Sequence, residues 1–216
     1  MSDRSISKSS LQRLPIYLNY LKSLHENTPL HISATSIAEA LELNDVQVRK
    51  DLASVSSSGK PKIGYATDVL IKELEAFLGY YNTNNAIIVG AGKLGKALMG
   101  YEGFKEYGLN VLMAFDTDTS VISEYDLILP LDRLGTLCRR MNIKIGIITV
   151  PAEHAQQVCD LLVENGVLAI WNFAPTHLTV PDGIIVQNEN MAASLAVLSN
   201  QLAEKINNRY KKEITR

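Results

Sequence analysis

The hydrophobic positions of this chain follow two different periods, and the change between them divides the sequence near residue 82. Before this point, leucines three or four residues apart predict helices over 11–25 and 69–81. After it, short apolar runs predict strands over 86–89, 111–115, 145–150, 169–173 and 184–188, with helices over 93–107, 131–141 and 151–165 between them. This alternation indicates an α/β fold with a doubly wound parallel sheet.

The first predicted strand runs into three glycines, Gly90, Gly92 and Gly95, with the spacing G-x-G-x-x-G. Gly90 allows a tight turn, and Gly92 removes the Cβ that would keep a pyrophosphate away. Gly95 allows the following helix to pack closely on the strand. The pattern predicts a dinucleotide site in which the phosphates lie at the N-terminus of that helix. The predicted phosphate-binding residues are Gly90, Ala91, Gly92, Lys93, Leu94 and Gly95.

Asp116 ends the second predicted strand, 21 residues after Gly95. This spacing places a carboxylate where it can bind the 2′-hydroxyl of an adenosine ribose. A negative charge there repels a 2′-phosphate, so NAD(H) is expected rather than NADP(H). Ligands of such sheets bind beyond the carboxyl ends of the strands. The residues that follow the strand expected beside this crevice are predicted to face the nicotinamide ring; they are Val150, Pro151 and Ala152.

Two short helices joined by a turn lie in the N-terminal part. Ser33 or Thr35 can cap the first, and Asn44 can cap the second, which is predicted over 45–53. This arrangement is typical of a helix-turn-helix, whose second helix enters the major groove of DNA. Three of its apolar residues are expected to face the core: Val46, Val48 and Leu52. Its polar residues suit DNA, because arginine and lysine pair with guanine or phosphate and glutamine with adenine; they are Gln47, Arg49 and Lys50.

The segment that follows, residues 54–65, is rich in Ser, Gly and Pro and is predicted to form the wing of a winged helix. Between residues 47 and 65, four basic residues stand against the single acid Asp51, a local net charge of +3 in a chain whose formal net charge is −2. This local charge favours binding to DNA.

The last predicted helix, over 190–212, carries an apolar stripe of Met191, Leu195, Leu198, Leu202 and Ile206. Because this helix follows a completed sheet, its stripe needs a partner surface, either in its own domain or across a dimer interface. We therefore expect three parts: a winged-helix domain over 1–82, a Rossmann domain over 83–190 and a C-terminal dimerisation helix over 191–216.

The composition is that of a globular protein, since 46% of the 216 residues are hydrophobic and 20% are charged. The N-terminus does not resemble a signal peptide, and no apolar run approaches the roughly 20 residues that a membrane span needs. Cys138 and Cys159 lack the spacing of a metal site or a redox motif. We expect a cytoplasmic protein with reduced thiols and no metal.

Together these parts resemble the family of redox-sensing transcriptional repressors called Rex. The resemblance covers nearly the whole chain, and the Arg-Leu-Pro and Asn-Phe-Ala-Pro motifs make it specific, because they are not general features of Rossmann proteins. The matching stretches are Arg13-Leu14-Pro15 with Tyr17, Val48-Arg49-Lys50-Asp51-Leu52, Gly64-Tyr65, Gly90-Ala91-Gly92-Lys93-Leu94-Gly95, Phe115-Asp116, Asn172-Phe173-Ala174-Pro175 with Leu178 and Pro181, and Asn188.

The resemblance implies a homodimer that represses transcription by binding a palindromic operator in double-stranded DNA and leaves it when NADH replaces NAD⁺. The cofactor is then a regulatory ligand, and no residue is catalytic. The terminal helix would be exchanged between subunits, so that Met191 of the partner could complete the nicotinamide pocket beside Val150, Pro151 and Ala152. The residues expected to face DNA are Gln47, Arg49, Lys50, Lys60, Lys62 and Tyr65.

The sequence departs from the common family pattern at two places. Before the wing it has Ser54, Val55, Ser56 and Ser58 in place of aromatic and glycine residues, and Pro61-Lys62 in place of a basic residue and glycine. This departure bears on operator preference. Asn190 stands in place of a frequent aspartate, which bears on any switch based on charge.

Two other functions compete with this interpretation. An NAD-dependent dehydrogenase would need a proton-transfer residue beside the nicotinamide, for which His154 and His177 are candidates. Neither has an evident acidic partner, and the winged helix leaves no room for a substrate domain. A module that binds coenzyme A would use a similar glycine turn, but Asp116 argues against it.

Overall fold

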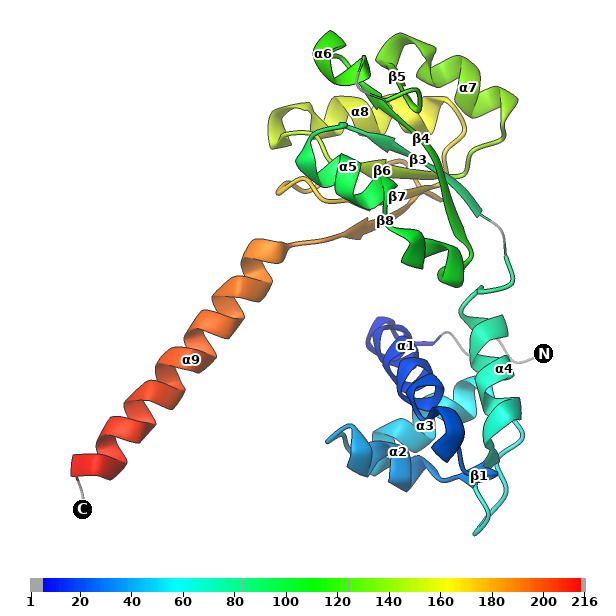
Figure 1. Ribbon diagram of the computed structural model, residues 1–216, viewed down its shortest axis with the longest axis vertical. Helices are drawn as coiled ribbons and strands as arrows, with labels where there is room; N and C mark the ends of the chain where they lie inside the picture. Colours follow the sequence, from blue (N-terminus) through cyan, green and yellow to red (C-terminus); the bar gives the residue numbers. More distant parts are fainter. Residues whose placement is uncertain (1–5, 83, 124, 215–216) are drawn as a thin grey trace. The chain divides into compact units, whose positions relative to one another are not determined.

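The computed structural model describes residues 6–82, 84–123 and 125–214, and the chain forms two compact units (Figure 1). The first consists of Met1–Thr83 and Lys105–Gly108, and the second of Asn84–Phe104 and Leu109–Arg216. Each unit has its own hydrophobic core, so each is described by itself.

The first unit is a bundle of helices with a small antiparallel sheet, β1 paired with β2. Its core includes fully buried leucines of α1 and α4 together with Ile37, Val48 and Leu52 from the two helices between them. The elements are α1 (Lys8–Ser23), η1 (His25–Asn27), β1 (His31–Ile32), α2 (Ala34–Ala40), α3 (Asp45–Val55), β2 (Tyr65–Ala66) and α4 (Thr67–Phe77).

Helices α2 and α3 form the predicted helix-turn-helix, and side chains cap both of them. Ser33 rather than Thr35 caps α2, since its Oγ accepts a hydrogen bond from the Ser36 N–H at 2.9 Å. Asn44 Oδ1 accepts from the Gln47 N–H at 3.1 Å and caps α3 as predicted. These caps satisfy N–H groups that have no partner inside the helix.

Two apolar residues of this unit face away from its core, and for Val46 this is contrary to prediction. Val46 is 64% exposed, because it lies two positions before the buried Val48 and therefore on the opposite side of α3. Phe77 is 42% exposed, since α4 ends at this residue and its last turn extends past the buried Leu74.

The second unit contains a parallel sheet of six strands within the described residues, in the order β5-β4-β3-β6-β7-β8. This confirms the predicted doubly wound fold. The order in which strands are added to the sheet reverses between β3 and β6, which are parallel neighbours. The strands are β3 (Asn84–Val89), β4 (Leu109–Asp116), β5 (Ile128–Pro130), β6 (Ile145–Ile148), β7 (Ala169–Asn172) and β8 (Ile185–Asn188).

Helices cover both faces of this sheet (Figure 1). Ile87 and Val89 pack with α7 (Leu134–Arg140) and α8 (Ala152–Glu164) on one face. Ala86 and Ile88 pack with α5 (Lys93–Met99) and α6 (Thr119–Ile122) on the other. Successive residues of a strand point to opposite faces, which explains why β3 is apolar throughout its buried part.

Two predicted helices of this unit are interrupted. The helix expected over 93–107 ends at Met99, because Gly100 follows as its C-cap, and a 3-10 segment η2 (Glu102–Tyr107) continues the chain. The helix expected over 131–141 begins as a 3-10 turn, η3 (Leu131–Arg133), before α7. Both interruptions lie outside the glycine turn of residues 90–95.

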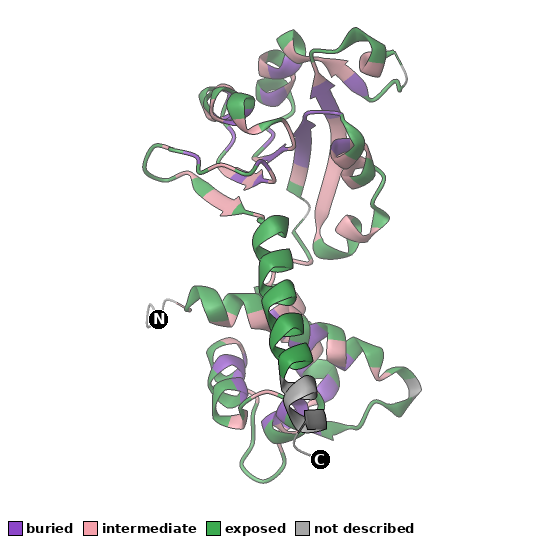
Figure 2. Ribbon diagram, turned by 90° about the vertical axis from the view of Figure 1, so that its left-hand side faces the viewer, coloured by how far each residue is buried: buried purple, intermediate pink, exposed green. Residues whose placement is uncertain are grey.

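The C-terminal helix α9 (Met191–Ile214) begins where Asn190 Oδ1 accepts a hydrogen bond from the Ala193 N–H at 2.8 Å. Its apolar stripe is open to solvent, since Leu195 is 62% exposed and Leu198 is 61% exposed (Figure 2). The stripe is thus without a covering surface in the part of the chain that the structure describes. None of the described helices is both long and apolar enough to cross a membrane.

Candidate functional site

The turn after β3 has the backbone geometry that its glycines predict. Gly90 has φ +100°, and a Cβ there would lie 2.9 Å from Val150 N. A Cβ on Gly95 would collide with the carbonyl oxygen of Gly90, whereas a Cβ on Gly92 would meet no atom within 4 Å. Gly90 and Gly95 are therefore required by the fold, and Gly92 leaves open space in front of the first turn of α5.

Asp116 fastens this turn to the end of the neighbouring strand. Its Oδ2 accepts a hydrogen bond from the Ala91 N–H at 2.6 Å, and its Oδ1 accepts from the N–H groups of Thr117 at 2.7 Å and Asp118 at 3.0 Å. Thr149, the residue after β6, holds the same turn, since its Oγ1 donates to the Gly90 carbonyl at 2.6 Å. The carboxylate lies beside the glycine turn, as the spacing predicts.

A cavity of about 450 Å³ opens beside Asp116 at the carboxyl ends of β3, β4 and β6. Its volume falls within the roughly 300 to 1,000 Å³ typical of small-molecule sites. Apolar side chains dominate its walls, with the carboxylate at one side. The lining residues are Val89, Gly90, Gly92, Phe115, Asp116, Thr117, Leu131, Thr149, Val150, Pro151, His154, Gln157 and Val158.

The cavity brings together only part of the predicted nucleotide set. It includes Gly90, Gly92, Asp116, Val150 and Pro151. The other predicted residues do not line it: Ala91 lies in the turn, Lys93, Leu94 and Gly95 lie in α5, and Ala152 and Met191 are the first residues of α8 and α9.

Sequence reasoning missed several cavity residues, notably Phe115, Leu131 and Gln157. Phe115 and Leu131 come directly before and after strand ends, a position that could have marked them. Gln157 lies one helical turn after His154 on α8, and no local signal in the sequence distinguishes it. His154, the candidate proton-transfer residue, lies in the same cavity as Asp116, on the side expected to hold adenosine.

The side chains of the asparagines at the ends of β7 and β8 form a hydrogen bond with each other and do not line the cavity. Asn172 is fully buried, and its Nδ2 donates to Asn188 Oδ1 at 2.8 Å and to the Thr176 carbonyl at 2.9 Å. Its Oδ1 accepts from the Ala174 N–H at 3.0 Å. Asn172 therefore holds the loop that follows β7.

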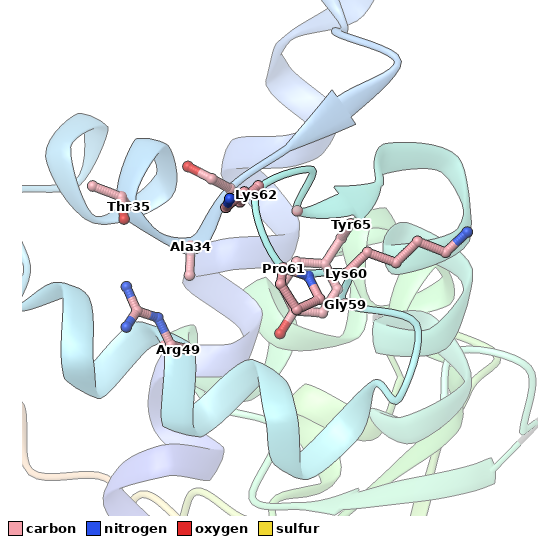
Figure 3. A pocket seen from close by; sticks show the side chains of 10 residues that line it. Ala34, Thr35, Arg49, Gly59, Lys60, Pro61, Lys62 and Tyr65 are labelled. Atoms are coloured by element: carbon pink, nitrogen blue, oxygen red, sulfur yellow. The ribbon is translucent and has the colours of Figure 1, made fainter.

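A second candidate site lies on the first unit, where α3 and the wing carry basic side chains. A hollow of about 540 Å³ is lined by Arg49, the wing and the start of α2. Figure 3 shows the Arg49 guanidinium directed toward Ala34 and Thr35, while the Lys60 side chain extends away from Arg49. The exposed, basic lining favours the phosphates and base edges of a nucleic acid.

Tyr65, which is predicted to face DNA, lines the same hollow but is almost entirely buried. Only 7% of it is exposed, because its ring lies under the wing, where a Cβ on Gly59 would approach the ring to 2.8 Å. Burial also raises the pKa of its hydroxyl above the ordinary value. The ring therefore supports the wing from below, and the residues of the predicted DNA-binding set that extend outward are Gln47, Arg49, Lys50, Lys60 and Lys62.

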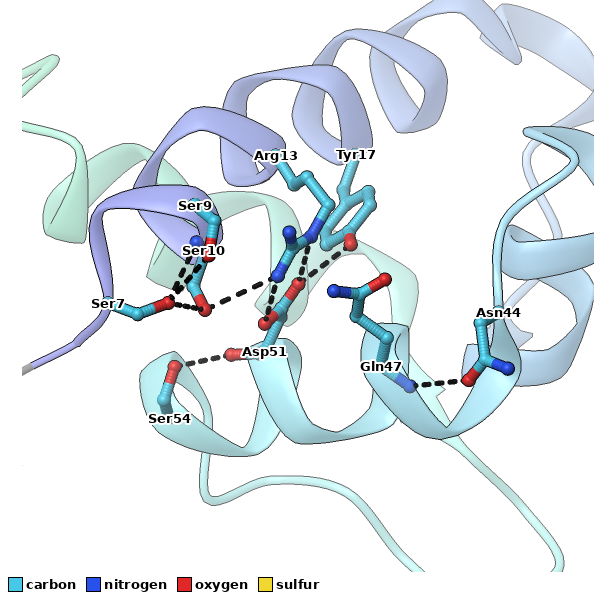
Figure 4. A network of polar contacts seen from close by, with 9 residues as sticks. All are labelled: Ser7, Ser9, Ser10, Arg13, Tyr17, Asn44, Gln47, Asp51 and Ser54. Atoms are coloured by element: carbon cyan, nitrogen blue, oxygen red, sulfur yellow. Dashed lines mark hydrogen bonds and ion pairs between the residues drawn. The ribbon is translucent and has the colours of Figure 1, made fainter.

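A buried polar network fixes α3 to α1 (Figure 4). Arg13 donates to both carboxylate oxygens of Asp51, from Nε at 2.7 Å and from Nη2 at 3.0 Å, and the Tyr17 hydroxyl donates to the same carboxylate at 2.9 Å. The side chain of Asp51 is only 2% exposed and that of Arg13 is 18% exposed. This bidentate pair holds α3 in a fixed rotation against α1.

Opposing effects act on the ionisation of this network. Burial alone would raise the pKa of Asp51, but hydrogen bonds from Arg13, Ser10 and Tyr17 outweigh it and hold that pKa below its ordinary value. Burial, together with the hydrogen bond to Asp51, raises the pKa of Tyr17 to about 12. The carboxylate is therefore charged and the phenol neutral near pH 7.

Two family models match the chain, one on each unit. The "CoA binding domain" matches residues 81–176, and the "Putative DNA-binding protein N-terminus" matches residues 5–53. The first describes the unit with the glycine turn, and the second the unit with α2 and α3.

Curated relatives match nearly the full length. The chain is 44% identical over 192 residues to the redox-sensing transcriptional repressor Rex of Treponema denticola, covering 88% of this chain and 91% of that protein. It is 40% identical over 203 residues to the redox-sensing transcriptional repressor Rex of Carboxydothermus hydrogenoformans, covering 92% and 97%.

Solved structures of one Rex-family repressor, RSP, resemble this structure. The complex of RSP with β-NAD⁺ and operator DNA has a TM-score of 0.87 at 32% identity, covering 99% of this chain and all of that one. The complex with β-NADH has a TM-score of 0.85 at 32% identity, covering 95% and 98%. On the evidence of sequence identity over nearly the whole length and of a shared fold, the chain belongs to the Rex family of redox-sensing transcriptional repressors.

Proposed function

We propose that this protein represses transcription by binding operator DNA and that it leaves the operator when NADH replaces NAD⁺. It is a regulator without catalytic residues, and NAD(H) is its regulatory ligand, bound without turnover. A protein with this role acts in the cytoplasm. One observation carries the proposal: a single chain combines an outward, basic helix-turn-helix face with a glycine turn closed by Asp116.

The nucleotide is held at the end of the sheet. The open space at Gly92 admits the pyrophosphate, and Asp116 accepts a hydrogen bond from the adenosine ribose. The apolar walls of the cavity, including Val150, Pro151 and Leu131, then suit the adenine base. This assignment moves Val150 and Pro151 from the nicotinamide end, where their sequence position suggested them, to the adenosine end.

DNA is bound by α3 in a major groove and by the wing beside it. Lys62 in the wing and Arg49 on α3 supply positive charge on the same face of the first unit. Gln47 and Lys50 are the outward residues of α3 that can reach base edges.

The operator-binding form is a homodimer in which α9 packs against the partner subunit. The support is the apolar stripe: Met191, Leu195, Leu198 and Leu202 are all more than 55% exposed in the single chain. An exposed stripe of this size on one helix is typical of an interaction surface. The two recognition helices of a dimer would then read the two halves of a palindrome.

The test is the binding of purified protein to a palindromic duplex selected by the protein from a randomised pool. Binding is measured at fixed salt, because phosphate contacts make the affinity strongly dependent on salt. Titration with NADH should release the duplex, whereas the same concentration of NAD⁺ should not. Retention of the duplex under NADH would refute the proposed regulation.

Coenzyme A is a second candidate ligand, because the matching family model of residues 81–176 is named for it. Coenzyme A carries a phosphate on its adenosine ribose, which the Asp116 carboxylate would repel. NADH should therefore compete with any bound coenzyme A at much lower concentration, and Asp116→Ala should reduce this preference. Tighter binding of coenzyme A than of NADH to the native protein would favour the alternative.

A further inference from the structure

The side chain of Gln47 on α3 lies against the guanidinium of Arg13 on α1 (Figure 4). Arg13 is itself fixed, since two of its nitrogens donate to the buried carboxylate of Asp51. Its Nη1 and the edge of Nη2 are directed toward the Gln47 amide. The contact therefore joins a rigid buried pair to a residue that faces outward on the recognition helix.

The chemistry of arginine decides which way the amide is oriented. A guanidinium has five N–H donors and no acceptor, so only the oxygen of an amide can bind it. The orientation drawn in Figure 4 turns the Gln47 nitrogen toward Arg13 and sets donors against donors. In the reverse orientation Gln47 Oε1 accepts from Arg13 Nη1 at 3.1 Å and from Nη2 at 3.2 Å, which satisfies both groups.

We propose that Arg13 restricts Gln47 to donating hydrogen bonds to a base. Gln47 then recognises guanine in the operator and rejects adenine. This inference rests on the proposed operator binding. Arg13 Nη1 donates to Oε1, and Nη2, which also donates to Asp51 Oδ1 at 3.0 Å and to Ser10 Oγ at 3.4 Å, shares a hydrogen with it; Oε1 is thus engaged and the Nε2 amino group is left for a base. Glutamine reads adenine through its oxygen and nitrogen together, and here the oxygen is already engaged.

Guanine fits the remaining donor group best. Its major-groove edge offers two adjacent acceptors, N7 and O6, to the two hydrogens of one Nε2 group. Adenine would set its 6-amino group against the same donor, and cytosine offers only a donor. Arg13 acts as a positioning residue, because it orients Gln47 without touching the base.

The experiment uses the full-length protein and the palindromic duplex that it selects from a randomised pool. Each base pair of one half-site, with its symmetry mate, is replaced by the other three, and the affinity of every duplex is measured at fixed salt. Comparison with Gln47→Ala identifies the position whose discrimination this side chain supplies. We expect guanine to be preferred there over adenine by about 5- to 100-fold in the native protein, and the preference to disappear in Gln47→Ala.

Two further variants test the role of Arg13. Arg13→Lys keeps a positive charge for Asp51, but one ammonium group cannot hold both Asp51 and Gln47. Because it also replaces the bidentate pair with Asp51, it should lower discrimination at the Gln47 position by more than at the other positions read by α3. Gln47→Glu retains an acceptor for Arg13 and has no donor, so it should lose the guanine preference even if Arg13→Lys fails to fold.

Lys50→Ala serves as the matched control from the same helix. It should weaken binding and alter discrimination at a different base pair, with the guanine preference at the Gln47 position unchanged. Preference for any other base at that position, or equal discrimination in native and Gln47→Ala proteins at every position, would overturn the inference. Absence of a selected duplex for the native protein would instead refute the proposed function.

Discussion

Replacement of Asp51 by Asn tests whether the pair with Arg13 holds the recognition helix in place. Asn has the shape of Asp but no charge. Both carboxylate oxygens of Asp51 accept hydrogen bonds, from Arg13 and Tyr17, whereas Asn has only one acceptor oxygen. Hydrogen bonds to charged groups contribute about 1.5–3 kcal/mol each, and breaking a buried pair costs about 3–5 kcal/mol. Because the Arg13 side chain is 18% exposed and can regain some water, we expect a loss of about 2–4 kcal/mol.

The pH dependence follows from the depressed pKa of Asp51. A carboxylate whose pKa is lower in the folded protein stabilises it above the pKa of the unfolded chain, about 3.9, and this contribution is lost as the pH falls through the folded pKa. Native protein should therefore exceed Asp51→Asn in stability by the full amount at pH 6–7, and the difference should shrink below about pH 4.

Native-state hydrogen exchange is the suitable assay, because it reports the opening free energy of each segment separately. Peptides from α1 and α3 should lose protection in Asp51→Asn. The fluorescence of Trp171, the sole tryptophan, reports on the second unit and should show an unchanged unfolding transition there. A loss below about 0.5 kcal/mol, or a difference that persists undiminished at low pH, would refute the reasoning.

Three further predictions concern the nucleotide turn, the last helix and cofactor discrimination. Gly92→Ala should leave the melting temperature unchanged but weaken NADH binding in calorimetry at least tenfold. Gly95→Ala should also lower the melting temperature, because a Cβ at Gly95, unlike one at Gly92, collides with the backbone. Leu198→Asp should convert a dimer into monomers in analytical ultracentrifugation; an unchanged mass would refute the α9 interface. In binding titrations, Val150→Ala should weaken the affinities for NADH and NAD⁺ equally, whereas Met191→Ala should change the ratio of the two affinities. The opposite pattern would indicate that Val150 contacts the nicotinamide ring.

Much of the fold could be predicted from the sequence because its signals are local. The strand β3, the glycine turn and Asp116 follow one another within a short stretch, and a Cβ on Gly95 would collide with the Gly90 carbonyl only five positions before it. The cap at Asn44 is likewise set by a residue three positions away. Such features depend little on the rest of the chain.

The contacts that sequence reasoning missed join distant residues. Arg13 and Asp51 both belong to stretches that resemble the family, but 38 positions separate them, and no spacing rule connects them. The burial of Tyr65 depends on how the wing folds over it, and the exposure of Val46 depends on which side of α3 meets α1 and α4. Periodicity identifies an apolar position but leaves its neighbours undetermined.

In the proposed binding mode, the cavity beside Asp116 supplies affinity for both cofactors, and the regulation depends on other residues. The adenosine halves of NADH and NAD⁺ are identical, so in this mode contacts at Asp116, Val150 and Pro151 would stabilise both ligands equally. A ligand shifts an equilibrium between two conformations only by its difference in affinity for them. The two cofactors differ in the charge and planarity of the nicotinamide ring. In this mode their discrimination requires side chains outside the cavity, which the exposed start of α9, with Met191 at 63% exposure, would supply in the proposed homodimer.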